Sequence, residues 1–229
     1  MVTTFIQQMR SQMGLPKSLL HSAQQQLAHD LTKLAPTSFR RFVEPMVGDM
    51  SFYFDLYRQG RIKKRSIFVG EDAALVVTYC QVRKKAEEVV KGLEALVPSK
   101  SQYKRLSSVS TRKKPSPADA VRFIFLKNFL TANGDGVADP ENVYAVSEAL
   151  QNSTLLRGEP YYAEKYIRHR DLVFLQPGDV YDVEEFFEQM AVRGAYVLLV
   201  GDKDQKEKWH RRWDVKEVGD HRVVRSWND

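Results

Sequence analysis

Polar side chains follow several apolar runs of the chain, and they are the side chains best placed to do chemistry. The runs end near Val43, Val69, Leu175 and Val200. In an open parallel sheet the ligand crevice lies beyond the carboxyl ends of the strands, so the turns after these runs are expected to line any site. The residues in those turns are Glu44 and Pro45; Gly70, Glu71 and Asp72; Gln176, Pro177, Gly178 and Asp179; and Gly201 and Asp202.

Some of these polar residues have more than one interpretation. Glu44 is either a polar anchor of a ligand pocket or a carboxylate that caps the following helix. Lys17 either approaches an anionic ligand or is solvated in the first turn of a surface helix. Residues 176–179 form part of a site or a plain strand-to-helix turn, with Asp179 or Asp182 as the helix cap.

The elements that must position these residues alternate between strands and helices. Leu75, Val76, Tyr79 and Val82 share one face of residues 73–96, which predicts an amphipathic helix. Further helices are expected at 14–34, 52–57, 118–130, 140–150 and 183–190, and strands at 39–45, 66–70, 172–175, 196–200 and 221–226. Residues 97–117 are rich in Ser, Lys and Arg and are predicted to be a mobile loop or a segment that orders on binding. The alternation predicts an open, largely parallel α/β sheet.

The composition is typical of a soluble globular protein. Of the 229 residues, 43% are hydrophobic and 28% charged, which excludes global disorder. No apolar run approaches the roughly 18 residues that span a bilayer, so no membrane partner is expected. The first residues lack the basic flank and apolar stretch of a secretory signal, and Cys80 is the only cysteine. We therefore expect an intracellular protein without internal disulfides.

Basic residues exceed acidic ones, 35 against 29, which favours polyanionic partners. They gather at residues 58–65, 99–117 and 206–213, the last interleaved with Trp209 and Trp213. Lys and Arg neutralise phosphates and flat rings stack on exposed bases, whereas the alternative is a set of solvated faces with the tryptophans in the core. The residues predicted to contact DNA or RNA are Lys63, Lys64, Arg65, Lys100, Lys104, Arg105, Arg112, Lys113 and Lys114.

No metal site is predicted. The five histidines show no metal-ligand spacing, and there is no cysteine cluster. Residues 133–139 resemble a calcium loop only superficially, because the terminal bidentate glutamate is missing. Cys80 has no nearby base and is expected to be structural.

Six segments, in their order along the chain, resemble one enzyme family. They are GLPKSLL from Gly14, FVEPMVGDMSF from Phe42, LVVTY from Leu75, RFIFL from Arg122, RGE from Arg157 and DLVFLQPGD from Asp171. This order is similar to that of the Dam-type adenine-N6 DNA methyltransferases. In that family a glycine-lysine turn, an F-x-E-P-F-x-G-G-G motif, a helical recognition lobe and a D-P-P-Y motif follow one another.

The resemblance implies an α/β fold: a Rossmann-like methyltransferase sheet with helices on both faces and a small helical insertion lobe. It implies a core of residues 1–82 and 150–229 and a recognition-type lobe of residues 83–149, with the basic loop 97–117. If the donor pocket survives, the residues implied to bind S-adenosylmethionine are Lys17, Glu44, Gly48, Glu71 and Glu159. In an active enzyme, the implied catalytic residues are Gln176, Pro177 and Tyr181.

The chain departs from the family at both chemical centres. In the family, D-P-P-Y holds the exocyclic amine of the target adenine and stacks on the flipped base. Gln176, Gly178 and Asp179 here replace its acid, second proline and aromatic ring. Only Gly48 remains of the glycine run, and Gly70 stands where an acid would grip the ribose. We therefore expect no cofactor unless the donor pocket still accepts S-adenosylmethionine.

These departures favour a catalytically degenerate, methyltransferase-like protein that binds nucleic acid or scaffolds an assembly. One alternative is a divergent, active adenine-N6 DNA methyltransferase. Another is a protein-interaction subunit of a large ribonucleoprotein or viral assembly, which requires protein partners.

Overall fold

The computed structural model describes residues 15–20, 25–109, 114–131, 138–177, 183–202 and 213–227. Contacts within the chain divide it into two compact units. The helical unit comprises Met1–Ala23, Asp49–Arg58 and Ala73–Gln151, and the sheet unit comprises Gln24–Gly48, Gln59–Asp72 and Asn152–Asp229. The expected division into 1–82 with 150–229 and 83–149 remains a prediction, and contacts assign residues 49–58 and 73–82 to the helical unit.

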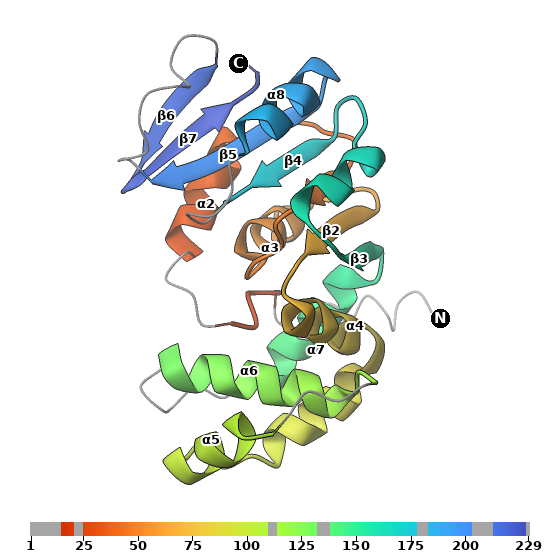
Figure 1. The fold of residues 1–229 in the computed structure, drawn as a ribbon, viewed down its shortest axis with the longest axis vertical. Helices are drawn as coiled ribbons and strands as arrows, with labels where there is room; N and C mark the ends of the chain where they lie inside the picture. The colour runs from red at the N-terminus through yellow and green to blue at the C-terminus, as the bar shows by residue number, and fades with distance from the viewer. Residues whose placement is uncertain are drawn as a thin grey trace. The chain divides into compact units, whose positions relative to one another are not determined.

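The sheet unit is built on one mixed sheet with the order β3-β2-β1-β4-β5-β7-β6 (Figure 1). The strands are β1 (Phe42–Glu44), β2 (Ser66–Gly70), β3 (Ser153–Arg157), β4 (Leu172–Leu175), β5 (Tyr196–Asp202), β6 (Asp214–Val218) and β7 (His221–Arg225). The five strands from β3 to β5 are parallel to one another, whereas β7 is antiparallel to both β5 and β6. The expectation of an open, largely parallel α/β sheet is confirmed.

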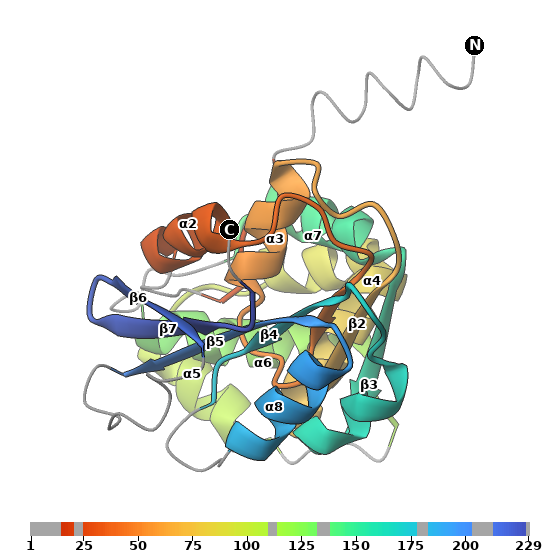
Figure 2. The same cartoon turned by 90° about the horizontal axis from the view of Figure 1, so that it is seen from above.

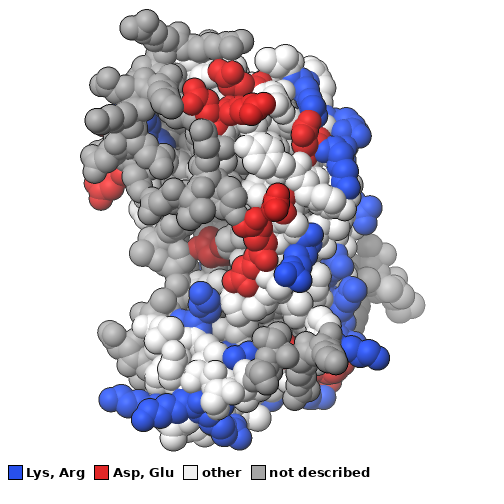
Figure 3. Space-filling view, viewed as in Figure 1, with Lys and Arg blue, Asp and Glu red and all other residues white. Residues whose placement is uncertain are grey.

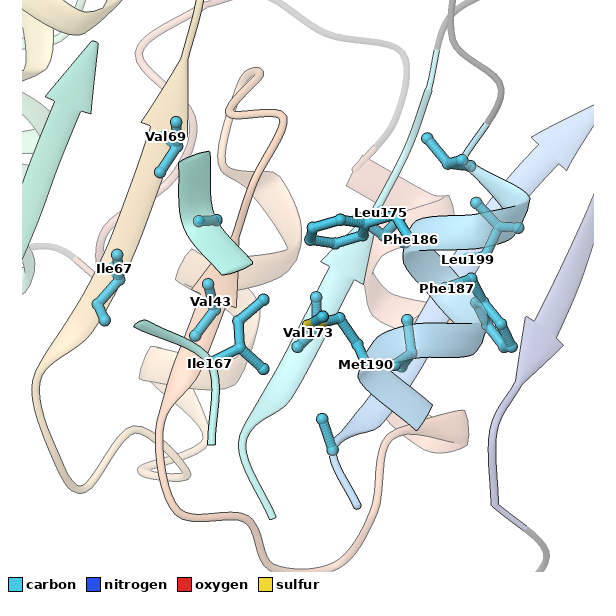
Figure 4. Close-up of a cluster of buried hydrophobic side chains, with 14 of the residues drawn as sticks. Val43, Ile67, Val69, Ile167, Val173, Leu175, Phe186, Phe187, Met190 and Leu199 are labelled. Atoms are coloured by element: carbon cyan, nitrogen blue, oxygen red, sulfur yellow. The ribbon is translucent and has the colours of Figure 1, made fainter. Parts of the chain in front are cut away.

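The central strands form because they are short apolar runs buried on both faces. Every residue of β1, β2 and β4 is buried. On one face, Val43, Val173 and Leu199 pack with Phe186, Phe187 and other residues of α8 (Glu184–Val192) and with η1 (Pro160–Tyr166), as Figure 4 shows. Continuous apolar strands of this kind are typical of parallel sheets covered on both sides.

Helix α2 (Gln25–Leu34) packs on the opposite face of the sheet, at the end formed by β6 and β7. Neighbouring residues of a strand point to opposite faces, and Val224 packs in the cluster under α8. The Arg225 side chain therefore projects to the other face, where its Nη1 donates to the carbonyl oxygen of Leu34 at 3.3 Å. Figure 2 shows α2 and α8 on opposite sides of the sheet.

The helical unit contains α3 (Ser51–Arg58), α4 (Ala73–Glu94), α5 (Lys100–Ser107), α6 (Pro117–Thr131) and α7 (Pro140–Leu150). Helix α4 packs along α6 and α7. It is kinked at Lys85, whose φ of −142° and ψ of 38° are not helical. Near the kink, the carbonyl oxygen of Arg83 accepts hydrogen bonds from Gln151 and Ser147, at 2.9 and 3.3 Å. Side chains of the segment around α7 thus satisfy a carbonyl beside the kink.

Two expectations about elements are wrong. Residues 15–20 are not helical, because polar side chains hold their backbone: Asn142 accepts from the Lys17 amide and Asn128 donates to the Leu19 carbonyl. The remainder of the expected helix is α2, residues 14 and 21–24 lying outside the described residues. In the expected loop 97–117, residues 100–107 form α5, which is capped by the Ser99 side chain. Strands β3 and β6 were not expected.

Candidate functional site

The carboxyl ends of the parallel strands meet at one edge of the sheet, called here the carboxyl edge. The register aligns Glu44 with Phe68 and Val43 with Val173, so β1 ends beside β2 and β4. The chain continues from β1 to β2 on one side, whereas β4 lies on the other side. Such a reversal of strand order is the place where open α/β sheets bind ligands. Glu44 ends β1 and Gln176 follows the neighbouring strand β4, so both residues lie at this reversal, as the sequence predicts.

Glu44 organises the turn that follows β1. Its side chain is buried, with 3% of its surface exposed. Its Oε1 accepts a hydrogen bond from the Gly48 amide at 3.2 Å, and the Val47 amide donates to the Val69 carbonyl of β2 at 2.8 Å. The carboxylate of Asp49, and not that of Glu44, accepts from the Ser51 amide at the start of α3. The interpretation of Glu44 as a helix cap is therefore wrong.

The turn after β1 keeps part of the backbone conformation expected for the glycine run of the F-x-E-P-F-x-G-G-G motif. Among the described residues, no atom beyond the chain neighbours lies within 4 Å of the position that a Cβ would take on Gly48. Met50, at the third glycine position of the motif, has a φ of 58°, in the left-handed region that glycine adopts most easily. A Cβ on Gly48 would therefore meet open space in the described part of the chain, and the Gly48 amide itself donates to the Glu44 carboxylate.

The remaining cofactor and catalytic predictions fall partly on the carboxyl edge. Glu71 follows β2 and Glu159 follows β3, and both side chains are exposed. Gln176 and Pro177 follow β4 and are half-buried, whereas Tyr181 lies outside the described residues. Residues 201 and 202 belong to β5 and pair with β7, so the expected turn there is wrong. The Lys17 side chain is exposed in the helical unit, and its role remains a prediction.

An aromatic group after β3 was not identified from the sequence. The Gly158 amide donates to the Gly70 carbonyl at 3.0 Å, and a Cβ on Gly158 would lie 3.3 Å from Tyr162. The Lys165 ammonium lies over the Tyr162 ring, 3.6 Å from the ring centroid. The hydrogen bond from Lys165 lowers the pKa of the Tyr162 phenol, and Tyr162 raises the pKa of Lys165 in return. The sequence signal that could have revealed this aromatic group is the Pro-Tyr-Tyr run directly after Glu159.

The predicted nucleic-acid contacts lie on separate surfaces. Lys63, Lys64 and Arg65 are exposed just before β2, at the amino end of that strand. In the helical unit, exposed Lys and Arg side chains form a row over α5 (Figure 3). The residues of this surface are Lys100, Lys104 and Arg105 on α5, and Lys114 is exposed before α6. Arg112, Lys113 and residues 206–212 lie outside the described residues.

Two possible features are missing from the described part of the chain. It contains no group of three or more His, Cys, Asp or Glu side chains that could hold a metal ion. No described helix is long and apolar enough to span a membrane.

Trp213 packs edge-to-face on Phe187 with 5.2 Å between ring centroids. Trp213 therefore lies against the core, which agrees with the sequence interpretation that places the tryptophans in the core.

The strand order, with the antiparallel β7 between β5 and β6, defines a Rossmann-like methyltransferase fold. No protein-family model and no curated protein matches the sequence. Solved structures with some similarity include the rRNA methyltransferase aviRa from Streptomyces viridochromogenes, at 15% identity over 90% of this chain and 88% of that one, with a TM-score of 0.46. A methyltransferase from Geobacter sulfurreducens is 13% identical over 98% and 86% of the two chains, with a TM-score of 0.42.

Proposed function

We propose that this chain is a catalytically degenerate relative of the Dam-type adenine methyltransferases that binds nucleic acid or scaffolds an assembly around it. The observation that carries the proposal is the basic, exposed side of α5. Lys100 and Lys104 are four residues apart, so they lie on the same side of the helix, and Arg105 adjoins them. No acidic residue occurs between Glu94 and Asp119. Such a cluster attracts phosphates and releases their counterions.

Helix α5 is held in place by its other side. The Tyr103 ring stacks on Phe129 of α6 with 5.2 Å between centroids, and Arg122 Nε donates to the Leu106 carbonyl at 2.7 Å. None of the α5 residues is buried, so the basic side chains have no part in the core of the helical unit. They therefore remain available for a polyanion.

The loss of methyl transfer is inferred from Gln176. A carboxylate accepts hydrogen bonds only, and the exocyclic amine of adenine is a donor. The Gln176 amide still offers one acceptor oxygen, but the side chain is one methylene longer and displaces that oxygen. At the end of β4 this exchange weakens both the binding and the placement of a target base.

The test compares nucleic-acid binding and methyl transfer. Binding of labelled DNA and RNA is measured across salt concentrations for the wild type and for Lys100→Gln/Lys104→Gln/Arg105→Gln. The matched control, Lys84→Gln/Lys85→Gln/Lys91→Gln, removes the same charge from exposed positions of α4. Wild-type affinity is expected to fall steeply with salt, and the α5 variant to lose affinity where the control does not.

Other outcomes would overturn the proposal. Affinity that stays flat across salt concentrations contradicts phosphate binding. Transfer of a labelled methyl group from S-adenosylmethionine to DNA or RNA contradicts catalytic degeneracy. If the chain purifies free of nucleic acid and in a stable complex with a protein partner, the interaction-subunit alternative is favoured.

An active, divergent methyltransferase is the second candidate, and the open space at Gly48 favours it. The carboxylates of Glu71 and Glu159 at the same edge are suited to accept hydrogen bonds from the ribose hydroxyls of S-adenosylmethionine. When bound, S-adenosylmethionine would supply the methyl group. Calorimetry with S-adenosylmethionine tests the pocket. Binding lost in Glu44→Ala and retained in Glu44→Gln, which keeps an acceptor for the Gly48 amide, supports this candidate.

A further inference from the structure

The amino ends of the parallel strands carry exposed basic residues along one continuous edge, called here the amino edge. Strands β2, β1, β4 and β5 are neighbours in that order. The exposed bases that precede them are Lys63, Lys64 and Arg65 before β2, Arg40 before β1, Arg168 and Arg170 before β4, and Arg193 before β5. The sequence scatters these residues from position 40 to position 193, and only the strand order brings them together.

Two acids near this edge, Asp171 and Glu164, are already paired with arginines. Asp171 is fully buried and pairs with Arg41, whose Nη2 lies 2.6 Å from Oδ2. Glu164 pairs with Arg193. By contrast, the side chains of Arg40, Lys63, Lys64 and Arg65 form no hydrogen bond or ion pair with the residues that the structure describes. The edge therefore has a surplus of unpaired positive charge.

Backbone hydrogen bonds fix the connections that carry these bases. The Arg40 amide donates to the Arg170 carbonyl at 2.7 Å, and the Arg170 amide donates to the Gly194 carbonyl at 2.8 Å. Gly194 has a φ of 78°, and a Cβ there would lie 2.4 Å from the His169 ring. The segments before β1, β4 and β5 are thus joined into one rim, which lowers the entropy cost of presenting its charges to a partner.

The length of the rim matches a stretch of nucleic-acid backbone. Strands in a sheet are about 4.8 Å apart, so the line from β2 to β5 spans about 15 Å. One strand of a duplex carries a phosphate about every 3.4 Å of helix axis, so a length of axis equal to the rim carries roughly four phosphates per strand, and those on the facing side of the helix can be contacted. In Figure 3, Lys and Arg gather along the side from which β2 and β4 start in Figure 1.

We propose that the amino edge binds the phosphodiester backbone of a nucleic acid, on the rim opposite the candidate donor site. This inference rests on the proposed nucleic-acid binding and gives that binding a second surface, in the sheet unit. Arginine predominates along the rim, and its planar guanidinium contacts phosphate oxygens with two parallel hydrogen bonds. Nucleic acid held there is remote from the carboxyl edge, which suits anchoring or scaffolding better than base modification.

The test uses the full chain and two labelled probes of equal length, a random-sequence DNA duplex and a single-stranded RNA. The edge variant is Arg40→Gln/Lys63→Gln/Lys64→Gln/Arg65→Gln. The charge-matched control is Lys33→Gln/Lys84→Gln/Lys85→Gln/Lys91→Gln, at exposed positions elsewhere. All four edge side chains are exposed, so circular dichroism and melting are expected to match the control.

In the expected result, the edge variant binds at least one probe roughly tenfold more weakly than the control between about 50 and 200 mM salt. The slope of log affinity against log salt becomes shallower by about 0.9 for each duplex phosphate that the variant no longer neutralises, or by about 0.7 for each phosphate of a single strand. The probe that shows the change identifies duplex or single-stranded nucleic acid as the partner.

Failure of this inference is distinguishable from failure of the proposed function. If neither probe binds the wild type, the proposed nucleic-acid binding itself is wrong. If the wild type binds, the α5 variant weakens and the edge variant equals the control, the amino edge is not a binding surface. If a polyglutamate peptide binds the edge and the nucleic acids do not, the partner is an acidic protein and this inference is overturned.

Discussion

Arg41 and Asp171 form an ion pair that joins the amino ends of β1 and β4. Arg41 Nε and Nη2 lie 3.2 and 2.6 Å from the two carboxylate oxygens of Asp171, which is inaccessible to solvent. Arg41 Nη2 also donates to the Tyr166 carbonyl, and the Arg168 amide donates to Asp171. Both charged groups are therefore hydrogen-bonded on several sides.

We predict that Asp171→Asn destabilises the fold strongly. Removal of one partner of a buried ion pair leaves the other charge uncompensated, and the expected loss in unfolding free energy is about 3 kcal/mol. Urea unfolding measures it. As the control, Glu88→Gln breaks the exposed Lys85–Glu88 pair and is expected to change little. Equal, small losses in both variants would mean that the Arg41–Asp171 pair has no structural role.

A second prediction concerns the crossing of α4 and α6 at Gly92. Alanine normally stabilises a helix interior by about 1 kcal/mol relative to glycine. Here the new Cβ would lie 2.6 Å from Cγ2 of the buried Val121. We expect Gly92→Ala to lower the unfolding free energy by about 1–3 kcal/mol through overpacking.

The compensating change is Val121→Ala, which removes the clashing methyl. The double variant is expected to be more stable than the sum of the two single effects, a coupling that a thermal or urea double-mutant cycle measures. Additive losses would show that the helices relax apart without cost.

The sequence predicts the elements whose apolar pattern is continuous. The bounds of β2, β4 and α7 agree with the expected 66–70, 172–175 and 140–150. Helix α5 was expected as a loop because KSQYKRLS has no apolar stripe, and its position depends on the Ser99 cap and on Tyr103 against Phe129. Strand β6 was not expected because DVKEV is charged, and it forms through pairing with β7 at the edge of the sheet.

The sequence likewise predicted part of the candidate site, namely which residues lie at the carboxyl edge, but not their contacts. Glu44 and Gln176 follow apolar runs, so their places at the carboxyl edge could be inferred from the sequence. The hydrogen bond from the Gly48 amide to Glu44 is a tertiary detail that no spacing reveals. The amino edge was unpredictable for another reason: Arg40 and Arg170 become neighbours only through the pairing of β1 with β4.

A third prediction follows from Asp214 in β6. Burial raises the pKa of this carboxyl, but hydrogen bonds from Arg225 and Lys216 outweigh that effect, and the pKa is lowered overall. A carboxyl with a lowered folded-state pKa contributes stability above its unfolded value of about 3.9, and that stability is lost as the pH falls through the folded-state value. The stabilisation is thus complete at neutral pH and disappears in acid.

Asp214→Asn removes this contribution. We expect the wild type to exceed the variant in unfolding free energy by a constant amount above about pH 5, with the difference shrinking below about pH 4. Urea unfolding at a series of pH values measures the two curves. A difference that stays the same into acid would show that the carboxylate does not titrate with folding.

The last prediction concerns the reactivity of Cys80, the only thiol of the chain. Burial on α4 raises the pKa of this thiol, and the nearby charges of Arg83 and Lys84 offset the rise only in part. Because the thiolate is the nucleophile, alkylation of the folded protein by iodoacetamide at neutral pH is expected to be slower than alkylation of glutathione. The rate should increase as the pH rises, and unfolding in urea should restore the rate of an ordinary thiol. Fast alkylation of the folded chain at neutral pH would contradict the burial of Cys80 and would indicate an activated thiol.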